Sequence, residues 1–269
     1  MKKLPAFLLI AVCFLAQPVF VRGQTFPGSS DDDFTLVDAY YLGRAVAANI
    51  LASYRPYTGN PEATAYLNRI CQTLVINSSL PPAFNGYHVM ILNSNEFNAF
   101  ATTGGHIFVT KKLVESASSE DMLAAVIAHE LAHIAKRHSI IIINEMRLTA
   151  EMSSIANRAS EMSGVSKSVS LFRDSISASM DTLMKNGYSQ NQEFEADMEA
   201  IVILRKAGYD PNALLDMLKL LQQQQGGQSG GLFSTHPSPI QRIAMVQSLQ
   251  FRASDTRQYR VSRFNGMKF

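Results

Sequence analysis

The pentapeptide His-Glu-Leu-Ala-His at residues 129–133 constrains this chain more than any other feature. Residues four apart are neighbours on a helix, so His129 and His133 can present two imidazoles to one metal ion. Glu130 then lies beside the position that a metal-bound water would occupy. The motif therefore predicts a zinc site with hydrolytic chemistry, in which Glu130 takes a proton from water and passes it on.

The residues around this motif predict a helix that packs against the core. Two serines at 118–119 precede two acidic residues at 120–121, which is typical of a capped helix start. Apolar residues then recur at helical spacing, at Met122, Leu123, Val126, Ile127, Leu131 and Ile134. We therefore expect one amphipathic helix over residues 119–146 that holds the zinc residues rigidly.

A catalytic zinc site usually has three protein ligands and one water, so a third ligand is expected on a facing element. Glu193 is the best candidate, on a helix predicted over 190–207 with a cap at Ser189 and a stop at Gly208. Asp197 shares a helical face with Glu193 and is expected to accept the free N–H of a ligand histidine. Taken alone, this Glu-x-x-x-Asp pattern is also typical of exposed helices.

Four motifs in this order resemble one family of zinc endopeptidases. The motifs are Asn-Ala-Phe-Ala-Thr-Thr-Gly-Gly-His-Ile-Phe-Val at 98–109, the segment 129–138, Gly-Tyr-Ser to Asp at 187–197, and Thr-His-Pro at 235–237 with Arg242. The family includes the CAAX prenyl protease and the HtpX membrane protease, and the likeness is greatest to its periplasmic β-barrel assembly-enhancing branch. Gln190 departs from the pattern, because the family commonly has Arg there.

Carried over by position, the resemblance implies the roles of five residues. Zn²⁺, one ion per chain, is bound by His129, His133 and Glu193. Glu130 is the catalytic acid and base, and Asp197 acts with it by orienting a ligand. The resemblance also implies a gluzincin-like fold, which matches a mostly helical α+β class.

Four further residues could belong to the site or to the structure around it, and two of them, His236 and Arg242, have two interpretations each. The resemblance implies that His236 occupies zinc's open position as a gate or fourth ligand, but a capping or core residue is the other reading. Arg242 either orients a carboxylate or the substrate carbonyl, or forms a structural salt bridge. His138 lies about 140° round the predicted helix from His133 and should not reach the same metal. We interpret His88 and His138 as structural.

The predicted secondary structure is mostly helical, with a small sheet beside the zinc helix. Helices are expected over 34–54, 61–76, 119–146, 150–185, 190–207, 211–224 and 239–250, and strands over 87–92 and 106–110. The second strand is expected to present an exposed edge to an extended peptide, an ordinary buried strand being the alternative. Residues 222–231 are rich in Gln and Gly and predict a mobile loop.

The ends and the composition bound the domain organisation. Residues 1–23 resemble a secretory signal, with Lys2 and Lys3 before an apolar run, and residues 24–269 form the expected catalytic domain without a helical-repeat tail. A retained membrane anchor is the alternative to cleavage and a periplasmic location. The signal holds three of the 24 basic residues and no acid, so the remainder has 21 basic and 22 acidic residues, a net charge of −1. No nucleic-acid partner is implied.

The expected function follows from these predictions. We expect a metalloendopeptidase that acts on unfolded or misassembled envelope proteins, with peripheral association with the membrane or with an outer-membrane assembly machine implied by the resemblance. The alternative is a chaperone or assembly factor in which the zinc is mainly structural. A cysteine protease is disfavoured, because Cys71 lies on an apolar helical stretch typical of a core.

Overall fold

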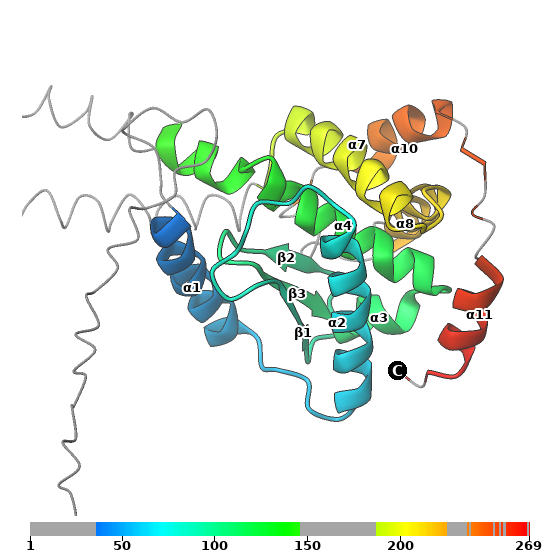
Figure 1. The fold of residues 1–269 in the computed structure, drawn as a ribbon, viewed down its shortest axis with the longest axis horizontal. Helices are drawn as coiled ribbons and strands as arrows, with labels where there is room; N and C mark the ends of the chain where they lie inside the picture. Colours follow the sequence, from blue (N-terminus) through cyan, green and yellow to red (C-terminus); the bar gives the residue numbers. More distant parts are fainter. Residues whose placement is uncertain are drawn as a thin grey trace, which may run out of the picture.

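The computed structural model describes residues 36–145 and 187–224, and residues 236–269 except 237, 250, 253, 255, 256 and 268. The predicted signal at 1–23, the predicted helix at 150–185 and residues 225–231 of the predicted loop lie outside these ranges. The helices are α1 (Leu36–Ser53), α2 (Pro61–Ile76), α3 (Lys111–Ser116), α4 (Glu120–Ala135), α7 (Gln190–Lys206), α8 (Asn212–Gln224), α10 (Pro239–Ser248) and α11 (Arg257–Asn265) (Figure 1). Residues 222–224 thus belong to α8 and not to a loop.

Within the part of the chain that the structure describes, three strands form a small mixed sheet, which confirms the α+β class. They are β1 (His88–Leu92), β2 (Ala99–Ala101) and β3 (His106–Thr110), in the spatial order β1-β3-β2. β1 runs parallel to β3 and β2 runs antiparallel to it. The prediction of β3 as an exposed edge was wrong, because β3 is the central strand. The edge beside α4 belongs to β2, which the sequence pattern did not predict as a strand.

The two faces of the sheet are covered by different helices, because strand side chains alternate between faces. Ile107 and Val109 of β3 face the main core under α2 and α4, whereas Phe108 faces Ala47 and Ile50 of α1. Figure 1 shows α1 on one side of the sheet and the layers of α4, α7, α8 and α10 on the other. The sheet is therefore the middle layer between α1 and the helical part.

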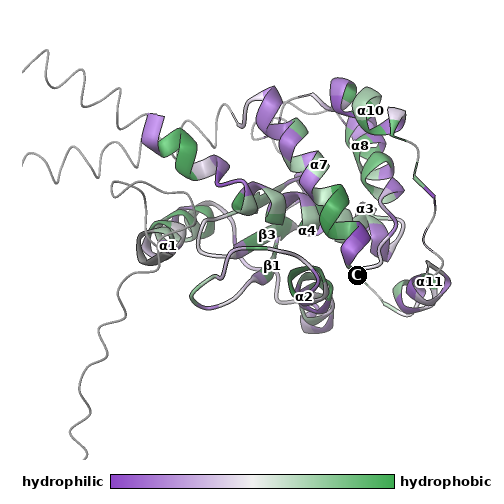
Figure 2. Cartoon of the chain, turned by 45° about the horizontal axis from the view of Figure 1, so that its top comes forward, coloured by the Kyte–Doolittle hydropathy of each residue, from purple (hydrophilic) through white to green (hydrophobic). Residues whose placement is uncertain are grey.

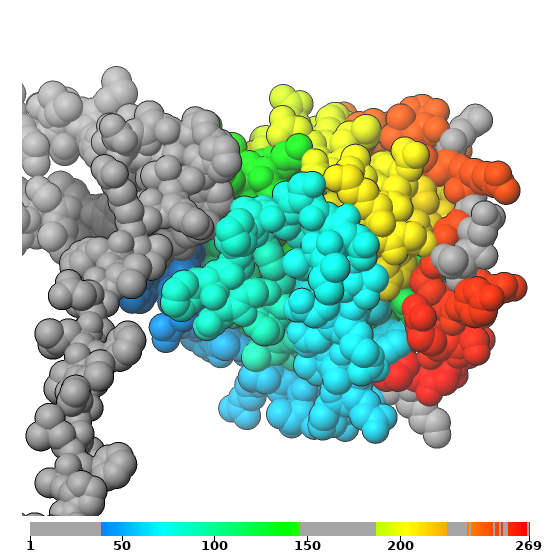
Figure 3. All heavy atoms as spheres, in the orientation of Figure 1, coloured from blue at the N-terminus to red at the C-terminus, as the bar shows by residue number. Residues whose placement is uncertain are grey.

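The motif helix α4 is the buried centre of the molecule. Every residue from Glu120 to His133 is buried, so the prediction of an amphipathic helix was wrong. Ser119 caps its start by accepting a hydrogen bond from the Met122 N–H at 3.2 Å, as predicted. In the space-filling view α4 is almost hidden by the segments around it (Figure 3). A helix buried on all sides holds its side chains in fixed positions.

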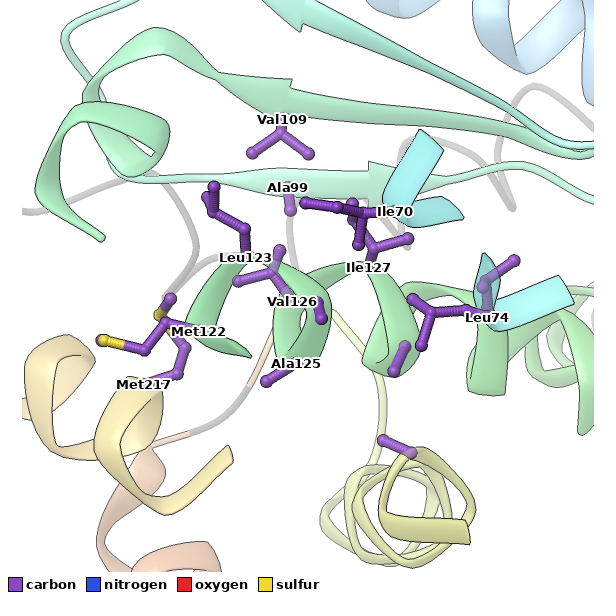
Figure 4. Packing of buried hydrophobic residues seen from close by; sticks show 14 of the residues in the cluster. Ile70, Leu74, Ala99, Val109, Met122, Leu123, Ala125, Val126, Ile127 and Met217 are labelled. Carbon is purple, nitrogen blue, oxygen red and sulfur yellow. The ribbon is translucent and has the colours of Figure 1, made fainter. Parts of the chain in front are cut away.

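Packing around α4 is apolar on both flanks of the motif. Leu123 and Ile127 point towards the sheet and α2, and Met122 points towards Met217 of α8 (Figure 4). Leu123 and Ile127 are 1% exposed, and burial of each such side chain stabilises the fold by about 2 kcal/mol. The residues of the His-Glu-Leu-Ala-His motif therefore lie on a helix whose side chains have little room to move.

The predicted helix over 119–146 is broken after α4. Arg137 has a φ of +58°, in the left-handed region, and its N–H donates to the Ile134 carbonyl at 3.0 Å. A second helical segment then runs over 138–145. The left-handed residue changes the chain direction, because a helix requires negative φ throughout. The estimate of 140° between His133 and His138 assumed a continuous helix and does not apply.

The start of α4 is joined to the C-terminal helix α11 by two ion pairs, of which the one between Asp121 and Arg260 is buried on both sides. Asp121 pairs with Arg260 at 2.9 Å, and Glu120 pairs with Arg263 at 2.5 Å. Glu120 also accepts hydrogen bonds from two tyrosine hydroxyls, so these acids do more than complement the helix dipole.

None of the described helices combines the length and the apolar character that spanning a bilayer requires.

Candidate active site

Three side chains from α4 and α7 converge at the centre of the molecule. The Nε2 atoms of His129 and His133 are 3.1 Å apart. Glu193 places Oε2 at 3.4 Å from His129 Nε2, and Oε1 at 3.4 Å from His133 Nε2. His129 is 7% exposed, His133 1% and Glu193 0%. The two histidines lie on α4 and Glu193 lies on α7, which is far from α4 in the sequence. Their convergence therefore depends on tertiary packing.

The local sequence of α7 explains why Glu193 is available to face α4. Ser189 and Gln192 form a capping box at its start, and Gly208, with a φ of +78°, follows its end. The Tyr209 N–H donates to the Leu204 carbonyl at 2.9 Å beyond that glycine, which closes the helix. Figure 2 shows α7 as hydrophilic in its first turns and hydrophobic farther along. The apolar part anchors the helix while the polar part carries Glu193.

The donor atoms of His129, His133 and Glu193 fit a metal ion in type and spacing. Buried imidazole nitrogens and a carboxylate oxygen are the usual ligands of zinc. Tetrahedral ligands about 2.1 Å from zinc lie about 3.4 Å from each other. The observed separations are 3.1 Å between the two nitrogens and 3.4 Å from each nitrogen to one of the two Glu193 oxygens, which is close to that value. Side chains of this type and spacing could hold a divalent cation.

Asp197 and Arg242 form a second layer around the donor atoms. Asp197 Oδ1 lies 3.1 Å from His129 Nδ1, on the side of the ring opposite the donor nitrogen. Arg242 of α10 binds Asp197 through Nε at 2.7 Å and Nη2 at 2.6 Å, and Glu193 through Nη1 at 2.5 Å. These contacts fit both predicted roles of Arg242, a residue that orients carboxylates and a partner in a structural salt bridge, and all three side chains are buried.

Charges around the site shift the pKa values of its residues. Burial and the charge of Arg242 act to lower the pKa of His129, but hydrogen bonds to Asp197 and Glu193 outweigh both and raise it to about 9. Burial opposes ionisation of Glu193, yet the charges of His236 and Arg242 hold its pKa well below its usual range. Burial holds the pKa of His133 well below its usual value, so a cation that binds here must displace a proton from His129 and not from His133 or Glu193.

Glu130 lies beside the donor atoms and next to an apolar cavity. It is 2% exposed, and burial raises its pKa above the usual value against the opposing charges of His236 and His129. A carboxyl with a raised pKa is suited to accept and return a proton near neutral pH. Apolar groups dominate the adjacent cavity, which is lined by Ala99, Leu113, Val126, Leu214, Met217, Leu218 and Leu221 together with Glu130 and His129.

His236 lies over the same cluster. Its Nδ1 is 2.6 Å from Glu193 Oε1, and its Nε2 is 3.6 Å from Glu130 Oε1. His129, His133, Glu193 and His236 each offer one ligand atom, and these four atoms lie within 4.8 Å of one another. His236 is 4% exposed, so it belongs to the buried site and is not a surface cap. The neighbouring residues 235 and 237 of the predicted motif lie outside the described part of the chain.

Two residues near His133 had no predicted part in the site. Tyr188 stacks on the His133 ring with centroids 3.8 Å apart and planes 17° from parallel. His138 places Nδ1 at 2.9 Å from His133 Nδ1. Tyr188 is part of the Gly-Tyr-Ser motif at 187–189, but the sequence pattern gave no role for its side chain. Among the described residues, His138 is not in the group of side chains that could hold a metal ion, but its Nδ1 contacts one member of that group, His133. His88, predicted as structural, is exposed and contacts the Asn85 carbonyl.

Residues 61–250 match peptidase family M48, which is more than half of the chain. The chain belongs to peptidase family M48. It is therefore a metalloprotease, and among the described residues the buried side chains of His129, His133, Glu193 and His236 could hold the metal. Several curated relatives agree with this assignment. The β-barrel assembly-enhancing protease of Escherichia coli K12 is 26% identical over 258 residues, which cover 88% of this chain and 50% of the relative.

Two other M48 relatives widen the comparison. The mitochondrial metalloendopeptidase OMA1 of Schizosaccharomyces pombe is 28% identical over 200 residues, covering 74% of this chain and 54% of that protein. The metalloprotease LoiP of Escherichia coli K12 is 26% identical over 189 residues, covering 70% and 71%. The chain spans about half the length of the assembly-enhancing protease, so the whole activity of that relative does not transfer automatically.

Proposed function

We propose that this chain is a zinc-dependent endopeptidase that hydrolyses peptide bonds of unfolded or misassembled envelope proteins. One observation carries the proposal, namely that donor atoms of His129, His133 and Glu193 lie 3.1 to 3.4 Å apart beside the buried carboxyl of Glu130. This spacing suits Zn²⁺, and three protein ligands leave a position for water and substrate.

Each residue of the site then has a separate task. When bound, Zn²⁺ lowers the pKa of water and polarises the peptide carbonyl. Glu130 accepts the proton of the attacking water and delivers it to the leaving amine. Asp197 accepts the Nδ1–H of His129, which leaves Nε2 as the donor towards the metal. Arg242 holds the carboxylates of Glu193 and Asp197 in place.

The edge of β2 suits an extended peptide. Among the described strands β2 has only β3 as a neighbour, and Ala99 of β2 lines the same cavity as Glu130 and His129. A peptide added to this edge would gain main-chain hydrogen bonds while one of its side chains faced an apolar wall. Unfolded proteins offer extended segments with exposed apolar residues, so this arrangement supports them as substrates.

We propose the periplasm as the place of action. The predicted signal at residues 1–23 and the relatives named for β-barrel assembly favour an exported protein that acts in the periplasm. Peripheral contact with a membrane or with an outer-membrane assembly machine follows from the same relatives. Cell fractionation of the tagged full-length protein tests this part, and retention of residues 1–23 in the mature protein would favour an anchored form.

Removing the metal tests the central proposal. We expect the purified protein to contain one zinc per chain and to cleave an unfolded substrate such as casein. A chelator should abolish the cleavage, and added Zn²⁺ should restore it, whereas Mg²⁺ should not because it prefers oxygen ligands. Metal content by mass spectrometry and cleavage on gels measure both. Full cleavage by metal-depleted protein would contradict the proposal.

His236 is proposed as a gate on the zinc. Its contacts with Glu193 and Glu130 support a position over the site, where an imidazole can act as a fourth ligand. Replacing His236 with Ala should raise casein cleavage by roughly fivefold or more, as a coupling of about 1 kcal/mol implies. His88→Ala, which changes an exposed histidine away from the site, should leave the rate unchanged.

The four-residue cluster also favours a second function. Closed sites with four protein ligands are typical of structural zinc, which would suit a chaperone or assembly factor. The two functions differ in the His236→Ala protein. Cleavage that increases supports the gated peptidase, whereas zinc binding without any turnover, even in this variant, supports the chaperone. A lower rate would show instead that His236 assists catalysis.

A further inference from the structure

His138 links a proposed zinc ligand to a carboxylate at the surface. Its Nδ1 lies 2.9 Å from His133 Nδ1, and its Nε2 lies 3.3 Å from Glu195 Oε2. The His138 side chain is 0% exposed, whereas that of Glu195 is 63% exposed. The chain of contacts therefore runs from the centre of the site to solvent through one buried imidazole.

The chemistry of metal binding sets the direction of these hydrogen bonds. His133 faces Glu193 and His129 with Nε2, so a cation bound there requires Nε2 without a proton. The proton of neutral His133 is then on Nδ1, which donates to His138 Nδ1. His138 consequently carries its own proton on Nε2, which donates to Glu195. Each nitrogen has one role, and the sequence of donors and acceptors is consistent.

The backbone is shaped to bring His138 to this place. Arg137 adopts a φ of +58°, a conformation that costs about 1 kcal/mol for a residue with a side chain. This residue ends α4 and lets the next residue return to the last turn of the helix, where His133 lies. On its other side the His133 ring is stacked on Tyr188, so ring rotation is restricted from two directions. Such strain is often retained where it positions functional groups.

We propose that His138 is a positioning residue, which orients His133 for zinc and is itself oriented by Glu195. His129 has the corresponding arrangement with Asp197, so each of the two histidine ligands has its own acceptor at Nδ1. Such acceptors fix the tautomer of a ligand histidine and increase its basicity. The inference rests on the proposed zinc site but does not depend on which substrate is cleaved.

Zinc affinity of the purified protein, measured by competition with a chelator, tests this role. His138→Leu should weaken binding by about 10- to 100-fold, because the acceptor for His133 is lost. His138→Asn should bind close to the wild type, since Asn Oδ1 takes the place of Nδ1. Glu195→Gln should weaken binding by a smaller factor. Glu199→Gln is the matched control, because Glu199 lies on the same helix and pairs with Lys136.

The double variant separates positioning from general structure. Asn at 138 has no Nε2 to reach the surface, so Glu195→Gln should have no further effect in His138→Asn protein. Absorption bands of the Co²⁺-loaded protein should shift in His138→Leu and remain unchanged in Glu199→Gln. Wild-type zinc affinity in folded His138→Leu would overturn the proposal, and so would equal losses in Leu and Asn variants. Absence of zinc binding by the wild type would instead refute the proposed function.

Discussion

Replacing Glu130 with Gln is expected to reduce peptide hydrolysis by about 10²- to 10⁴-fold, the usual contribution of a general acid and base. Gln has nearly the same size as Glu, so the packing around this 2% exposed side chain should persist. It cannot accept a proton from water or return one to the leaving amine. The rate is measured with a quenched fluorescent peptide derived from an unfolded substrate, at a concentration well below saturation.

Metal content distinguishes this loss from a damaged site. Glu130 is not one of the four residues that offer ligand atoms, so the Gln variant should bind as much zinc as the wild type. Glu199→Gln, the same chemical change on a surface ion pair of α7, should retain the full rate. Undiminished cleavage by Glu130→Gln would refute the assignment of the base, and loss of zinc would assign Glu130 to the ligand set.

Replacing Arg242 with Met is expected to lower the free energy of unfolding of the metal-depleted protein by about 3 to 5 kcal/mol. Arg242 is 2% exposed and is the guanidinium partner of both Glu193 and Asp197. Despite the opposing effect of burial, Arg242 contributes to holding the pKa values of both carboxyls below their usual range. At pH 7 the variant therefore keeps two buried negative charges with less compensation. Urea unfolding followed by circular dichroism measures the change.

A surface ion pair provides the control for Arg242. Lys136 pairs with Glu199 at 2.9 Å, with side chains that are 40% and 27% exposed. Lys136→Met should lower the free energy of unfolding by about 1 kcal/mol or less, because solvent screens the charges. Equal effects of the two substitutions would show that Arg242 is not the electrostatic clamp of the site. Zinc should partly restore the stability of Arg242→Met, because its charge replaces part of the lost guanidinium.

The ends of the two site helices could be predicted from the sequence because local contacts determine them. Ser119 caps α4, and Ser189 with Gln192 caps α7. Gly208 ends α7 because glycine adopts its φ of +78° without a steric penalty. These interactions join residues at most a few positions apart, so a pattern of residue types is enough to identify them. The helices predicted over 61–76, 190–207 and 211–224 agree with α2, α7 and α8 to within one residue at each end.

The structure of the segment after α4 was not predictable in this way. Arginine is rarely found at a φ of +58°, so no residue type marked the break at Arg137. The angle between His133 and His138 was computed for a helix that does not continue. Likewise, the short strand β2 holds only three residues, too few for a periodic signal, and its pairing with β3 makes β3 central. Both wrong predictions, the continuous helix through Arg137 and β3 as an edge strand, concern features for which no local residue pattern gives a signal.

Family membership and the types of the proposed metal-binding side chains follow from the sequence, because histidines four apart on a helix and a motif order shared with peptidase family M48 are local patterns. Only the tertiary structure decided the depth and partners of the site. It buried α4 on all sides, brought Glu193 to 3.4 Å from both histidines, and placed Arg242 and His236 against the carboxylates. These contacts join residues that are 43 to 64 positions apart, and packing in three dimensions sets such distances.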